Sequence, residues 1–222
     1  FELRAPNPFT NTYLAVSCLY LTALDGVKYA VNCGKTPDEL LKELSKTARE
    51  DADYLQKERE YRCEKNVFED YTQEERDAVF GKPPATVWEN VKIMKENPDK
   101  VAVLTQGDGI SEAIVDSFVA GIVYRWENEL IDRLIPDTEA AVKRYKKLIH
   151  EDELDEERWD SISTKRIELI KDGRHKKCIC TKLKEALKRK DYDMASNLQR
   201  EMVRKTEALG EEYRIYALNI ID

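Results

Sequence analysis

Residues that interrupt regular structure are scarce in this sequence. Only eight glycines and seven prolines occur among its 222 residues. Because glycine and proline are the strongest local breakers of helices and strands, their scarcity predicts few and long elements. Cysteine occurs five times, an odd number at irregular spacing, which argues against a disulfide framework. Reduced thiols in the cytosol are the simpler interpretation, and we predict a cytoplasmic protein.

Long hydrophobic runs are also lacking. The longest apolar stretch, from Tyr13 to Leu24, is interrupted by Ser17 and Thr22. This stretch is too short to span a bilayer, which needs about 20 apolar residues. The sequence also lacks a basic start followed by a short apolar core, which is the pattern of a secretory signal peptide. We therefore expect no membrane partner.

Excess positive charge is absent too. The 37 lysines and arginines are outnumbered by 44 aspartates and glutamates, which gives a net charge of −7. A general nucleic-acid-binding protein would show a basic face, so we predict no nucleic-acid partner. Long stretches of Glu, Lys, Leu, Ala and Arg favour helix. We expect an all-α, mostly helical fold with at most a short strand at the extreme N-terminus.

The apolar stretch near the N-terminus predicts a helix unlike the others. Asn11 can cap it, and Asp25-Gly26 is a stop signal after Leu24. The segment is hydrophobic nearly all round, which is typical of a helix buried on several sides. Such a helix needs partners, and we expect it to pack against residues 111–135 or to drive dimer formation.

Capping signals predict three helices that follow. Thr36-Pro37-Asp38-Glu39 is a capping box, and the apolar spacing after it continues to about Glu64. Thr72 begins a short helix that ends at Gly81. Thr86 begins another, which ends at an Asn-Pro pair.

The middle of the chain contains a glycine pair and a long apolar stripe. Gly107-Asp108-Gly109 lacks the strand and helix that flank a phosphate-binding loop, so we interpret it as a turn. A helix is predicted from Ser111 to Ile135, and Pro136 should end or kink it. Another helix should then run to about His150.

The last third of the chain predicts further helices. An acidic run over 150–158 suits a linker or a helix N-terminus, where the helix dipole favours negative charge. Asp172-Gly173 and Asp191-Tyr-Asp193 separate the helices that follow. Lys182 to Leu209 resembles the helical-hairpin interaction motif of nucleotide-excision repair proteins. A shared pairing role and an ordinary antiparallel helix pair both explain this pattern.

Glu2 and Arg4 are the strongest candidates for chemistry. Residues two apart on a strand point to the same face. A carboxylate beside a guanidinium can hold a divalent metal and an anionic oxygen of one substrate. A surface ion pair is the alternative, and these residues alone favour it.

Three linked motifs carry a family resemblance. They are Glu2-Leu-Arg4-Ala-Pro6-Asn-Pro8, Asn11-Thr-Tyr13-Leu14-Ala15 and Ala23-Leu-Asp25-Gly26. In this order and spacing they resemble the C-terminal part of the glutamine synthetase catalytic domain, and a weaker match continues to about Ile149. Asn7 stands where the family usually has Asp, Thr12 where it has Pro and Ala23 where it has Gly, but none of these departures touches a charged group that the chemistry needs.

The resemblance implies an enzyme and its ligands. In that family, ATP phosphorylates the side chain of glutamate, and ammonia displaces the phosphate to give glutamine. Glu2 would bind a catalytic metal, Mg²⁺ or Mn²⁺, and Arg4 would bind substrate. No residue here is assigned a catalytic role.

The resemblance also implies how the chain is organised. Residues 1–150 would be the C-terminal portion of the catalytic domain, and 151–222 an added helical extension. The chain would be a fragment, inactive alone, of a homo-oligomeric ligase that binds glutamate, ammonia and ATP. A non-enzymatic helical interaction module is the alternative function, favoured by the charge-rich helices.

Two cysteines near a histidine raise a further possibility. His175, Cys178 and Cys180 lie close in sequence, but a zinc site would need a second spaced pair of ligands. Neighbouring lysines could lower the thiol pKa values and make the cysteines reactive. Two ordinary helix cysteines remain the simplest interpretation.

Overall fold

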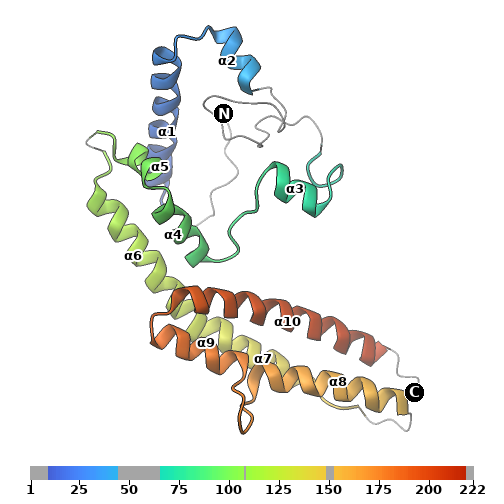
Figure 1. Cartoon of the computed structure of the whole chain (residues 1–222). Helices are drawn as coiled ribbons and strands as arrows, with labels where there is room; N and C mark the ends of the chain where they lie inside the picture. The colour runs from blue at the N-terminus through green and yellow to red at the C-terminus, as the bar shows by residue number, and fades with distance from the viewer. Residues whose placement is uncertain (1–9, 45–65, 108, 149–152, 219–222) are drawn as a thin grey trace. The chain divides into compact units, whose positions relative to one another are not determined.

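The computed structural model describes residues 10–44, 66–107, 109–148 and 153–218 (Figure 1). Every regular element within those ranges is a helix, which confirms the predicted all-α class. The predicted N-terminal strand lies outside the described residues, and so does the predicted helical segment 45–64.

Side-chain caps fix where the N-terminal helices begin, as predicted. Helix α1 (Thr12–Asn32) is capped by Asn11, whose Oδ1 accepts a hydrogen bond from Leu14 N at 3.2 Å. Helix α2 (Pro37–Leu44) begins with the predicted capping box, and α3 (Gln73–Val79), whose start at Thr72 was predicted, begins with a capping box as well. In each box a threonine hydroxyl accepts a backbone N–H, and a glutamate three residues later accepts the threonine's own N–H.

Two predictions about α1 are wrong. The helix continues past Asp25-Gly26 to Asn32, because Gly26 stays helical and Gly34, at φ +70°, supplies the left-handed residue beyond the C-cap. The helix is also not buried on several sides, since none of its residues is fully buried. It packs against the short 3-10 turn η1 (Val103–Thr105), which covers only part of its surface.

Of the next three helices, the first and the last begin where they were predicted to begin, and the short one between them was not predicted. Helix α4 (Val87–Glu96) ends before an Asn-Pro pair, and α5 (Pro98–Ala102) leads into η1. Gly107 then adopts φ +96°, a conformation that favours glycine and suits a turn. Helix α6 (Glu112–Asn128) begins directly after Ser111, whose hydroxyl accepts Ile114 N–H at 3.4 Å.

Pro136 lies inside a helix. Helix α6 passes through a π-helical turn, η2 (Glu129–Leu134), into α7 (Ile135–Arg144), which holds Pro136 in its first turn. The Ile135 N–H donates to the carbonyl oxygen of Leu130, five residues back. This wider turn makes room for a ring that would clash with the preceding turn of an α-helix. Helix α7 ends earlier than predicted.

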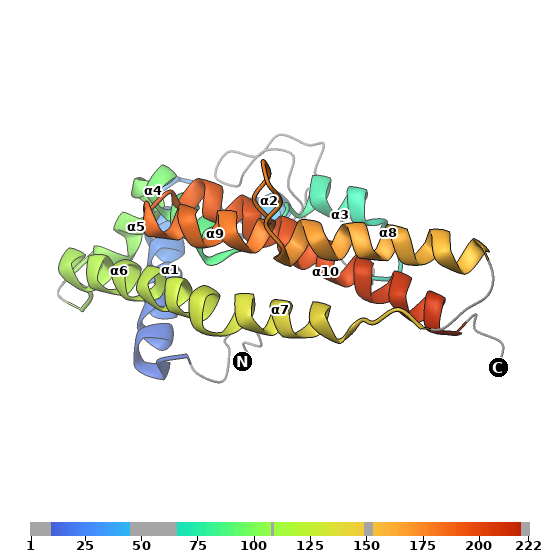
Figure 2. The same ribbon diagram turned by 90° about the horizontal axis from the view of Figure 1, so that it is seen from below.

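The last three helices lie side by side. They are α8 (Glu153–Ile170), α9 (Ile179–Lys188) and α10 (Tyr192–Leu218). Helix α10 packs against α8 and α9, and α8 also packs against α7 (Figures 1 and 2). The α9–α10 pair confirms the predicted antiparallel hairpin.

By packing, the chain divides into two units. Unit 1 comprises Phe1–Pro84 and Met94–Val115, and unit 2 comprises Ala85–Ile93 and Asp116–Asp222. The hydrophobic core of the described residues lies in unit 2, where its buried members include Trp126, Leu130, Ile135, Val142, Ile162, Leu169, Leu183, Met202 and Leu209. The division at residue 150 rests on the family resemblance and stays a prediction.

Candidate functional site

The residues predicted to bind metal and substrate, Glu2 and Arg4, lie outside the described residues. Their roles therefore stay predictions. Within residues 10–44, 66–107, 109–148 and 153–218, no group of three or more His, Cys, Asp or Glu side chains could hold a metal ion.

The two cysteines of the last third are structural. Cys178 and Cys180 are both buried. Cys178 caps α9, since its Sγ accepts Thr181 N–H at 3.4 Å and its own N–H donates to Asp172 Oδ1 at 2.8 Å. Burial raises the pKa of the Cys180 thiol to about 12. These contacts favour two ordinary helix cysteines over a metal site with His175, which is exposed.

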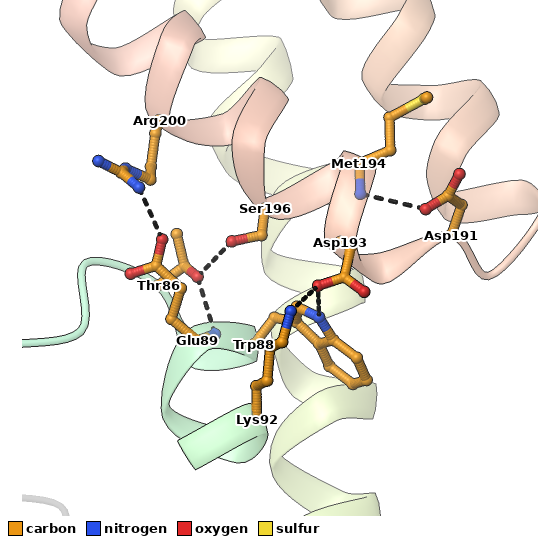
Figure 3. A network of polar contacts seen from close by, with 9 residues as sticks. All are labelled: Thr86, Trp88, Glu89, Lys92, Asp191, Asp193, Met194, Ser196 and Arg200. Carbon is orange, nitrogen blue, oxygen red and sulfur yellow. Dashed lines mark hydrogen bonds and ion pairs between the residues drawn. The ribbon is translucent and has the colours of Figure 1, made fainter. Parts of the chain in front are cut away.

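A polar network joins the start of α4 to the start of α10 within unit 2 (Figure 3). The Thr86 hydroxyl accepts Glu89 N–H at 3.1 Å, which caps α4, and also shares a 2.6 Å hydrogen bond with the Ser196 hydroxyl. Thr86 and Ser196 are 7% and 3% exposed, so this hydrogen bond is shielded from water.

Charged groups extend the network on both sides of the buried hydroxyl pair. Asp193 Oδ1 accepts hydrogen bonds from Trp88 Nε1 and Lys92 Nζ, both at 3.1 Å. These two bonds, that of Trp88 first, lower the pKa of the Asp193 carboxyl. Arg200 binds Glu89 at 3.0 Å (Figure 3). These charged pairs, together with the buried hydroxyl pair, hold the start of α4 against the start of α10.

A second polar cluster lies at the α9–α10 turn. Lys190 has φ +58° and completes a Schellman-type turn, in which Asp191 N–H donates to the carbonyl oxygen of Ala186 at 3.0 Å. Its ammonium reaches both carboxylate oxygens of Glu127 at 2.7 and 2.8 Å. Glu127 is only 8% exposed, so a buried carboxylate on α6 is neutralised from the hairpin turn. Burial tends to raise the pKa of Glu127, but hydrogen bonds from Lys190 and Tyr192 reverse the shift, and the pKa is lowered.

An open groove of about 560 Å³ lies beside the first network. Its lining includes Arg200 and Arg204 on one turn of α10, but also Glu201 and Glu207. The mixture of charges gives it no preference for an anion or a cation.

Comparison with known proteins supports one relationship. The chain is 28% identical over 127 residues to a glutamine synthetase from Clostridium saccharobutylicum. The match covers 57% of this chain and 21% of that protein, so the chain spans about a fifth of the relative it matches. A region of this chain is therefore related to glutamine synthetase. No protein-family model matches the chain. No solved structure matches it either.

The sequence predicted only part of the two polar clusters, the one between α4 and α10 and the one at the α9–α10 turn. Thr86 was expected as a helix cap, whereas its bond to Ser196 was not expected. Asp191 and Asp193 were interpreted only as an interruption between helices. Asp191 in fact caps α10 by accepting Met194 N–H at 3.1 Å, a role that an Asp before an amphipathic run signals.

Proposed function

We propose that this chain is the C-terminal part of a longer glutamate–ammonia ligase of the glutamine synthetase type. The observation that carries the proposal is the set of three motifs in family order, supported by the similarity of 127 residues to a glutamine synthetase. In the longer protein, ATP would phosphorylate the glutamate side chain and ammonia would displace the phosphate. Alone, the chain would be inactive.

The roles of Glu2 and Arg4 follow from their chemistry. A guanidinium binds a carboxylate or phosphate through two parallel hydrogen bonds, so Arg4 would orient the anionic end of the substrate. A carboxylate oxygen is a preferred ligand of Mg²⁺ or Mn²⁺, which would neutralise phosphoryl oxygens when bound. A single carboxylate is too few ligands for such an ion, so other segments of a longer, homo-oligomeric protein would supply the rest.

Activity of the full-length protein tests this proposal. Glutamine formation from glutamate, ammonia and ATP would be measured for the wild type, Glu2→Ala and Arg4→Ala, with oligomer size checked by gel filtration. We expect large losses in both variants at unchanged size. Glu2→Ala should also bind the metal ion more weakly than the wild type, which calorimetry measures. Full activity in both variants would contradict the assigned roles, and an inactive wild type would contradict the ligase.

A second candidate is a non-enzymatic helical interaction module. It is favoured by an open groove of about 730 Å³ on the α9–α10 hairpin, whose lining includes the apolar Met194 and Leu198 among charged residues of both signs. The coding sequence upstream of Phe1 separates the two candidates. Metal-binding glutamates and a nucleotide site should be encoded there only if the chain is part of the ligase.

A further inference from the structure

We draw no further inference here: the strongest candidate, the exposed apolar stripe from Tyr13 to Val31 on helix α1, a helix of 21 residues that is long and apolar enough to cross a membrane, carries none because nothing in the part of the chain that the structure describes shows what covers it.

Discussion

The hydroxyl groups of Thr86 and Ser196 lie 2.6 Å apart although the two residues are separated by 110 positions in the chain. Thr86 also caps α4, so one side chain both begins a helix and joins it to another. A buried hydroxyl that loses its partner costs more free energy than an ordinary hydrogen bond contributes. The stability of unit 2 should therefore be sensitive to both positions.

Thr86→Ala should lower the free energy of unfolding by about 1–3 kcal/mol, because it removes the α4 cap and leaves Ser196 unpaired. Thr86→Ser should retain most of the stability, since it keeps the hydroxyl. Urea unfolding measures both, with Thr164→Ala on the exposed face of α8 as the control. A Thr86→Ala variant as stable as that control would show that the Thr86–Ser196 hydrogen bond contributes nothing.

Lys190→Ala should be less stable than Lys190→Gly. Both changes remove the ion pair to Glu127, but only alanine must adopt φ +58° with a Cβ. Left-handed backbone costs a non-glycine residue about 1 kcal/mol, so this difference should appear in urea unfolding. At a helical position alanine would be the more stable of the two. Equal or reversed stabilities would contradict the left-handed turn at Lys190.

The contribution of Glu127 to stability should depend on pH. Its pKa is lowered in the folded protein, so its contribution is complete above the unfolded value of about 4.3 and is lost as pH falls through the lower folded pKa. Glu127→Gln should therefore be less stable than the wild type at pH 7, and the difference should shrink below about pH 4. A difference that stays constant from pH 7 to pH 3 would contradict the shift.

Cys180 should resist alkylation in the folded protein. Its thiol is buried and its pKa is raised to about 12, so little thiolate forms near neutral pH. Peptide mass spectrometry after a short iodoacetamide pulse at pH 8 should find Cys18 and Cys33, which are half-buried, modified before Cys180. In urea the three sites should react at similar rates. Rapid native modification of Cys180 would contradict its burial.

Helix starts could be predicted from the sequence because their hydrogen bonds join near neighbours. Asn11, Thr36 and Thr72 all cap the helices they were expected to cap. The end of α1 was misjudged because two glycines follow its apolar run. Only the backbone conformation shows that Gly34 and not Gly26 takes the left-handed turn.

Burial was harder to predict than helix position. The most hydrophobic segment of the chain, α1, has no fully buried residue, whereas the polar and charged α10 supplies Met202 and Leu209 to the core. Hydrophobicity measures the gain from burial, but burial also requires a surface of matching shape. Unit 2 provides that surface through three adjacent helices, and the described part of unit 1 provides little of it.

The sequence by itself determined the all-α class, the helix caps and the motifs of the glutamine synthetase resemblance. Each of these depends on residues that are close together in the chain. Only the tertiary structure decided that Thr86 meets Ser196 and that Lys190 neutralises Glu127. Contacts across 110 and 63 positions depend on how whole helices pack, and packing is a property of many side chains at once.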